Sequence, residues 1–213
     1  MPICASNPRR GQRAHRRRAR PHRRVGERGA TLVEGALVAP LFFLLIFSIL
    51  EFGLVFRQYL TMSTADRNGT RAASAAGNAA QADYVTLQAI KKSSTAIKTS
   101  EITAIVIFKA SGPAASINDV ALQACLTASV AGVCNRYTAA DLARPVGDFG
   151  NCSLGSASPD RFWCPTTRVV AASGPPDYIG VYIATRYQAV TKIFGKSYNL
   201  SEQTVYRMEA QTR

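Results

Sequence analysis

Glu34 and Glu51 are the two side chains whose position in the sequence calls for a chemical partner. They are the only ionisable residues between Ala30 and Phe56, a stretch that is otherwise mainly apolar. A charged side chain inside a bilayer costs about 3 kcal/mol on insertion scales, so a carboxylate at that depth requires a group that compensates it. The simpler alternatives are that Glu34 reaches the inner membrane interface and that Glu51 marks the outer one.

No residue pattern in the sequence indicates catalysis. The only histidines, His15 and His22, lie in the basic N-terminal segment, so the rest of the chain has no Ser-His or Cys-His pair and no histidine metal ligand. The sequence contains no phosphate-binding loop, dinucleotide fingerprint or closely spaced carboxylate pair. A Ser-Lys dyad stays open, although nothing points to one. We therefore expect no enzyme activity, no cofactor, no metal ion and no small-molecule substrate.

Four cysteines follow the apolar segment, whereas Cys4 stands alone near the start of the chain. An even set of this kind is typical of an oxidising exterior, where two disulfides of about 2–4 kcal/mol each stabilise a loop-rich region. The set allows three pairings, of which we expect the sequential one. A four-cysteine zinc site is the alternative, but it lacks any C-x2-4-C pair. The expected disulfides are Cys125–Cys134 and Cys152–Cys164.

The apolar segment is long enough to cross a membrane as one helix. Residues 30–56 number 27, and at about 1.5 Å each they span about 40 Å. A bilayer core needs roughly 20 residues, and membrane helices tolerate a proline such as Pro40. The alternatives are a buried core helix, although residues 41–50 are apolar on every face, and a cleaved secretory signal. The nearest small-x-small site, Ser63-Thr64-Ala65, lies far beyond the apolar run.

Most of the positive charge lies ahead of that segment. Residues 1–29 hold ten arginines against Glu27, a net charge of +9 out of +13 for the whole chain. We expect this leader to be disordered and to stay in the cytoplasm, because basic residues next to a span orient it. The domain that follows would then be extracytoplasmic. Nucleic-acid binding is the alternative, but no aromatic residue is interleaved for base stacking.

The remainder of the chain has the pattern of a small α+β domain. Residues 57–97 predict a helical stalk, and 98–213 predict an extracytoplasmic domain with a three- or four-stranded antiparallel sheet. The region 112–172 is irregular and holds the four paired cysteines, which makes it a disulfide-stapled insert. The strand candidates are 101–110, 177–190 and 198–210.

Small residues dominate the helical stretch over 63–80. Small side chains let two helices approach closely. The partner of this surface is either the chain's own domain or a neighbouring subunit, and the sequence alone favours neither.

The stretch that begins at Gly29 resembles a known processing and assembly signal. A glycine followed five residues later by Glu34 has the form of the type IV prepilin cleavage site. The wider region resembles the N-terminal part of TadE-like proteins, which are pseudopilins of the tight-adherence (Tad, or Flp) pilus systems. The likeness covers about 45 residues. It is carried by Arg28-Gly29-Ala30, Val33-Glu34, Ala36-Leu37-Val38 before Pro40, Glu51-Phe52-Gly53 and Arg67-Asn68-Gly69-Thr70-Arg71-Ala72-Ala73.

This resemblance implies that a prepilin peptidase cuts between Gly29 and Ala30. It also implies that Glu34 neutralises the new N-terminal amine of a neighbouring subunit, and it makes Glu51 a second residue of assembly. The implied partners are the membrane, other pilin subunits, the peptidase and an inner-membrane pilus assembly platform. The implied location is the cytoplasmic membrane, with a single span, and then the cell surface within a pilus.

Two other classes of function stay open from the residues alone. An uncleaved single-pass protein could use its outer domain to bind an envelope or surface partner. A membrane-tethered nucleic-acid binder would use the arginine-rich leader, with an affinity that falls steeply as salt rises. Cleavage distinguishes the pilin from both, because only a processed chain loses residues 1–29.

Overall fold

The computed structural model describes residues 27–153, 155–170 and 174–209. Residues 1–26 lie outside the described part, so the disorder and cytoplasmic location expected of the leader remain predictions. The chain forms two compact units, one that ends at Leu44 and one that begins at Leu45. The first contributes, among its described residues, only helix. The second contains the rest of that helix and the whole α+β domain.

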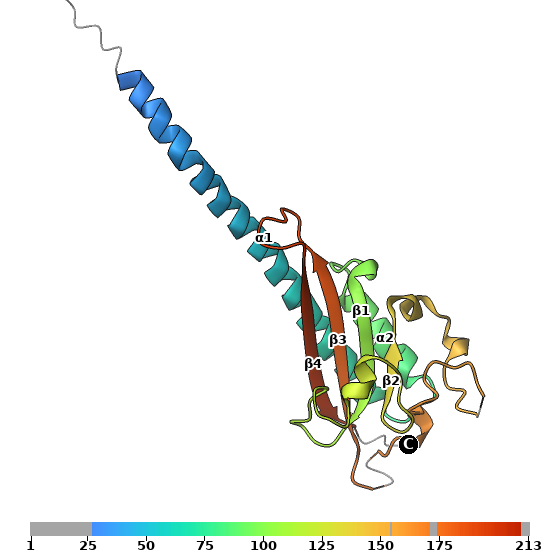
Figure 1. Cartoon of the computed structure of the whole chain (residues 1–213). Helices are drawn as coiled ribbons and strands as arrows, with labels where there is room; N and C mark the ends of the chain where they lie inside the picture. The colour runs from blue at the N-terminus through green and yellow to red at the C-terminus, as the bar shows by residue number, and fades with distance from the viewer. Residues whose placement is uncertain (1–26, 154, 171–173, 210–213) are drawn as a thin grey trace, which may run out of the picture. The chain divides into compact units, whose positions relative to one another are not determined.

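Helix α1, Glu27–Ala76, is 50 residues long and continues through Pro40 (Figure 1). From Gly29 onward it is long and apolar enough to cross a membrane. Its most apolar 18-residue window has a mean hydropathy of 2.4, and 6 % of that window is buried. A core helix of a soluble protein would be mostly buried, so this alternative does not fit the apolar part of α1.

The C-terminal part of α1 belongs to the hydrophobic core of the second unit. Met62, Ala65 and Ala73 are fully buried there together with residues of helix α2, Ala82–Ser93. Secretory cleavage after Ala65 would cut inside α1 and remove Met62 from this core. The structure therefore argues against a signal peptide that is cleaved at that site.

Helices α1 and α2 meet through the small residues noted in the sequence. A Cβ added at Gly69 would lie 2.5 Å from Cγ1 of Ile90, so only a glycine permits this approach. The small-residue surface thus packs against the chain's own domain. Helix α1 ends at Ala76, and Gly77 has a left-handed φ of 56°. The helical stretch expected over 57–97 is accordingly two helices joined by a turn.

The domain contains a four-stranded antiparallel sheet, which confirms the predicted α+β class. The strand order is β2-β1-β3-β4. Three strands lie close to the predicted ranges, whereas β2 lies inside the region expected to be irregular. It is four residues long and has no apolar alternation that could have indicated it. The strands are β1 Ile102–Ala110, β2 Cys134–Tyr137, β3 Tyr178–Gln188 and β4 Ser197–Arg207.

The sheet separates two layers of core, because successive side chains of a strand point to opposite faces. Ile105 and Ile107 of β1 pack with the residues of α1 and α2. Val106 and Phe108 pack on the other face, beneath segment 111–133. Figure 1 shows α2 behind the sheet, on the helical side. The C-terminal part of α1 thereby packs in the core on one face of the sheet.

Candidate functional site

Gly29 and Glu34 both lie in the exposed N-terminal part of α1. Glu34 is exposed and makes no hydrogen bond or ion pair with any part of the chain that the structure describes. Nothing lies within 4 Å of a Cβ added at Gly29 or at Gly35. The first turns of α1 are therefore open to an enzyme or to another subunit, and Glu34 has no compensating group within its own described chain.

Glu51 has the opposite environment. Its side chain is 1 % exposed, and its carboxylate accepts three hydrogen bonds from the loop between β3 and β4. The Val190 amide donates to Oε1 at 3.1 Å, and the Thr191 amide and hydroxyl donate to Oε2 at 2.8 and 2.9 Å. The sequence grouped Glu51 with Glu34 as an assembly residue, but the structure gives Glu51 partners within its own chain.

The helix itself separates the two glutamates. They are 17 residues apart on α1, one in each compact unit. The Glu51 carboxylate is satisfied by donors of its own domain, whereas Glu34 is exposed and has no partner in the described chain. Of the two, Glu34 is the candidate for a bond to another molecule.

Asp66 is a third carboxylate on α1, and the sequence did not single it out. It is fully buried, and neither carboxylate oxygen has a well-formed hydrogen bond in the described structure. Burial raises its pKa to about 8, the nearby Thr204 side chain lowers it in part, and the charges of Glu202 and Arg67 act in opposite directions. Asp66 therefore holds a proton at neutral pH while the chain is folded.

This buried acid predicts a pH dependence of stability. The unfolded chain loses the Asp66 proton near pH 4, whereas the folded chain keeps it up to about pH 8. The contribution of neutral Asp66 to the free energy of unfolding is thus fully present below pH 4 and decreases as pH rises towards 8. We expect Asp66→Asn to remove roughly 3–4 kcal/mol of this decline between pH 5 and pH 8.

The measurement is urea unfolding of the full chain in detergent at several pH values. Asp119→Asn is the matched control, because Asp119 is an exposed aspartate of the same domain. Equal slopes for the Asp66 variant and the parent chain would contradict the prediction.

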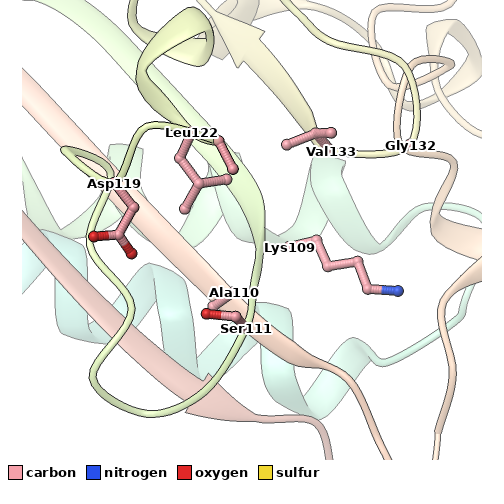
Figure 2. Close-up of a pocket in the computed structure, with 8 residues that line it drawn as sticks. Lys109, Ala110, Ser111, Asp119, Leu122, Gly132 and Val133 are labelled. Carbon is pink, nitrogen blue, oxygen red and sulfur yellow. The ribbon is translucent and has the colours of Figure 1, made fainter.

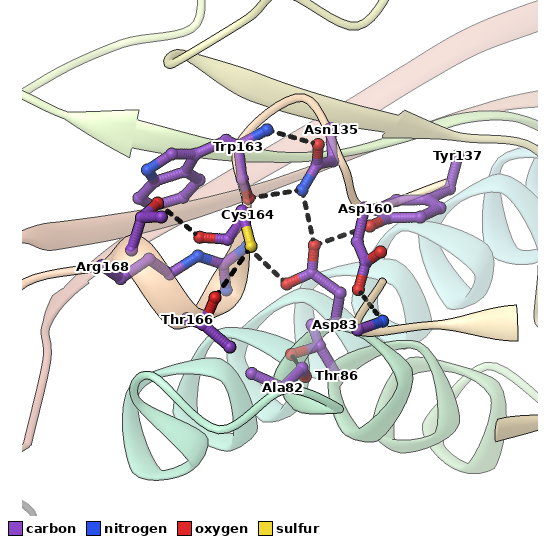
Figure 3. Close-up of polar contacts among 12 residues, drawn as sticks. Ala82, Asp83, Thr86, Asn135, Tyr137, Asp160, Trp163, Cys164, Thr166 and Arg168 are labelled. Atoms are coloured by element: carbon purple, nitrogen blue, oxygen red, sulfur yellow. Dashed lines mark hydrogen bonds and ion pairs between the residues drawn. The ribbon is translucent and has the colours of Figure 1, made fainter. Parts of the chain in front are cut away.

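The most buried polar cluster joins α2, β2 and the segment that follows Asp160 (Figure 3). Asp83 is fully buried and contacts Nη2 of Arg168 at 2.6 Å through Oδ1. Its Oδ2 accepts hydrogen bonds from the Tyr137 hydroxyl at 2.6 Å and from Nδ2 of Asn135 at 2.8 Å. The Arg168 guanidinium lies 4.2 Å from the centre of the Trp163 ring.

This cluster combines types of side chain that are found in active sites, but its burial gives it a structural role. Burial raises the pKa of Tyr137 well above its usual value, and the charge of Asp83 raises it further. Asp83, Tyr137 and Arg168 are at most 2 % exposed, so no substrate reaches them in the folded chain. The cluster holds the insert to the domain.

An apolar hollow lies at one end of the sheet (Figure 2). It has a volume of about 320 Å³ and is lined mainly by apolar side chains and backbone. Its two charged residues already have partners: Lys109 pairs with Asp177 at 3.1 Å, and Asp119 accepts the Ser116 amide at 2.9 Å. Both charged groups of the lining are therefore already engaged within the domain.

The four cysteines of the domain are joined as Cys125–Cys134 and Cys152–Cys164. This is the sequential pairing, and it excludes the four-cysteine zinc site, because every thiol is in a disulfide. Within the described ranges no group of three acidic, histidine or cysteine side chains is arranged to hold a metal ion. The first bridge ties segment 111–133 to β2, and the second closes a loop that leads into the Asp83 cluster.

Comparison with known proteins bears on the N-terminal part of the chain. No curated protein and no solved structure matches it. One family model matches residues 29–71, and its description is TadE-like protein. The match begins at Gly29 and includes Glu34 and Glu51, while the sheet and the disulfides lie beyond it. The chain therefore carries the TadE-like region of that family in its N-terminal helix, from residue 29 to residue 71.

Proposed function

We propose that this protein is a pilin-like structural subunit of a Tad-type pilus, processed after Gly29 by a prepilin peptidase. One observation carries the proposal: the TadE-like match begins at Gly29, at the start of an apolar helix on which Glu34 is exposed without a partner in the described chain. The family relates the chain to pilus-associated membrane proteins, and an uncompensated carboxylate at that position supports assembly with other subunits.

Cleavage would convert Ala30 into the first residue and create a positive amine close to the membrane surface. The Glu34 carboxylate of one subunit would neutralise the amine of its neighbour. Attraction between such charges is far stronger in a low dielectric than in water. An unpaired Glu34 is penalised and a paired one is tolerated, so this pair would select one register between adjacent helices.

The proposed topology places the N-terminus in the cytoplasm and the domain outside. The arginine-rich leader favours this orientation, since positive residues next to a span stay inside. The two disulfides also suit an oxidising compartment. The remaining partners, which are an inner-membrane assembly platform and the other pilins, follow from the family relationship.

A second candidate is an uncleaved single-pass protein whose outer domain binds an envelope or surface partner. It is favoured by the extent of the match, which ends at residue 71 and leaves the sheet and the two disulfides of the domain outside it. The two candidates differ in whether residues 1–29 remain on the mature chain.

We expect Gly29→Val to block processing, because the larger side chain changes the residue at the scissile bond while nothing in the structure clashes with it. The measurement is the intact mass of the membrane-bound chain, with and without the prepilin peptidase of the same organism. The parent chain should lose residues 1–29 only when the peptidase is present.

Gly35→Val is the matched control, since a Cβ at Gly35 is equally free of contacts. It should be cleaved like the parent chain. A parent chain that keeps its leader in the presence of the peptidase would overturn the proposal and favour the permanent anchor.

A further inference from the structure

The loop between β3 and β4, residues 189–196, leaves three large apolar side chains exposed. Val190 is 69 % exposed, Ile193 48 % and Phe194 46 %. The loop also carries two exposed lysines, Lys192 and Lys196, and it contains no acidic residue. Apolar side chains flanked by lysines are typical of a surface that lies in a membrane interface.

The loop has a defined conformation and a defined place. Its base is closed by a hydrogen bond from the Ala189 amide to the Lys196 carbonyl at 3.1 Å, and Lys192 adopts a left-handed φ of 57°. The carboxylate of Glu51 accepts the amides of Val190 and Thr191. These contacts fix the loop to α1 at one turn of the helix.

That turn of α1 coincides with the outer end of the predicted span. A bilayer core is crossed by about 20 helical residues, and 20 residues counted from Glu34 end within one turn of Glu51. At this level α1 exposes Phe52 and Phe56, and the Phe52 ring lies 5.9 Å from the ring of Phe194. The apolar surface of the loop is therefore continuous with the exposed apolar surface of α1.

We propose that the β3–β4 loop is a second membrane contact of this protein. Val190, Ile193 and Phe194 enter the outer leaflet of the membrane that α1 crosses, and Lys192 and Lys196 meet the phosphates of anionic lipids. Glu51 acts as the positioning residue, because its three hydrogen bonds hold the loop against the helix at the depth of the headgroups. This contact requires only that α1 spans the membrane, so it holds for a processed subunit and for a permanent anchor.

The test places a tryptophan at the tip of the loop. The full-length Phe194→Trp variant is reconstituted into phosphatidylcholine vesicles, with and without phosphatidylglycerol, using lipids brominated at different depths of the acyl chain. We expect the added emission to shift to the blue and to be quenched most strongly by bromine close to the headgroup. The parent chain supplies the baseline, because its single tryptophan, Trp163, is buried in the domain.

A matched control uses the other end of the sheet. Val120 is 90 % exposed and lies in the segment that follows β1. The last residue of β1 pairs with the first residue of β3. The proposed membrane contact instead follows the last residue of β3, so Val120 lies at the opposite end of the sheet. Val120→Trp should emit like a water-exposed tryptophan and should not be quenched. Replacing Lys192 and Lys196 with glutamine should remove the dependence of the Phe194→Trp signal on phosphatidylglycerol.

Two results would overturn the proposal. The first is emission from Phe194→Trp that is neither shifted nor quenched in either vesicle, since the loop would then lie in water. The second is a blue shift that depends on protein concentration and not on brominated lipid, which would assign the loop to a contact between copies of the chain. Neither result bears on cleavage after Gly29, so failure here is distinguishable from failure of the proposed function.

Discussion

Glu34→Ala should leave cleavage after Gly29 intact and abolish incorporation of the chain into filaments. Glu34 is exposed on α1 and has no partner in the described structure, so its removal costs the isolated subunit nothing. The assembled subunit would lose the carboxylate that neutralises the amine of its neighbour. An unpaired charge in a low dielectric is strongly penalised, so we expect loss of incorporation rather than a partial decrease.

The measurement compares the amount of the chain in sheared filaments with the amount left in the membrane. It uses cells that express the variant in place of the parent chain. Intact mass reports cleavage in the same samples. Leu32→Ala is the matched control, because Leu32 is 75 % exposed on the same stretch of α1; it should be both cleaved and incorporated. Normal assembly of Glu34→Ala would defeat the proposed charge pair.

Arg168→Met should destabilise the domain by about 3–5 kcal/mol, because it leaves the buried Asp83 carboxylate without its counter-charge. Much of that cost reflects the uncompensated charge rather than the intrinsic strength of the pair. We therefore expect Asp83→Asn to restore part of the stability when it is added to Arg168→Met. The asparagine still accepts a hydrogen bond from Tyr137 and carries no charge.

Urea unfolding of the full chain with its disulfides intact measures this loss. Arg144→Met is the control, since Arg144 pairs with Asp141 at 2.6 Å but is 43 % exposed at its side chain. Exposed ion pairs contribute about 0–1 kcal/mol. If the Arg168 and Arg144 variants lost equal stability, the argument from burial would be wrong.

Local sequence patterns predicted the parts of this fold that depend on local physics. A continuous apolar run indicated α1, a stretch rich in isoleucine and valine over 101–110 indicated β1, and alternation over 177–190 indicated β3. Strand β2 escaped prediction because Cys-Asn-Arg-Tyr has no alternation of its own. It becomes a strand only through its register with β1, where Cys134 pairs with Phe108.

The polar contacts were not predictable from the sequence for a related reason. Glu51 finds its donors 139 and 140 residues later in the chain, and Asp83 finds Tyr137 54 residues later. Neither pair has a spacing that a helix or strand would bring together. Glu34 differs, because its position after Gly29 in an apolar helix is itself the signal.

The bond between Glu51 and the β3–β4 loop ties part of the apolar helix to the compact domain. A soluble fragment that starts after the apolar run, at Arg57, would retain Met62 and the rest of the helical core. It would lose the acceptor of the Val190 and Thr191 amides. The compact domain accordingly begins at Leu45, so part of the sequence that qualifies as membrane anchor is also needed for the outer domain to be complete. Anchor and domain overlap by about three turns of helix, and a boundary drawn by hydropathy alone would remove a part of α1 that the domain uses.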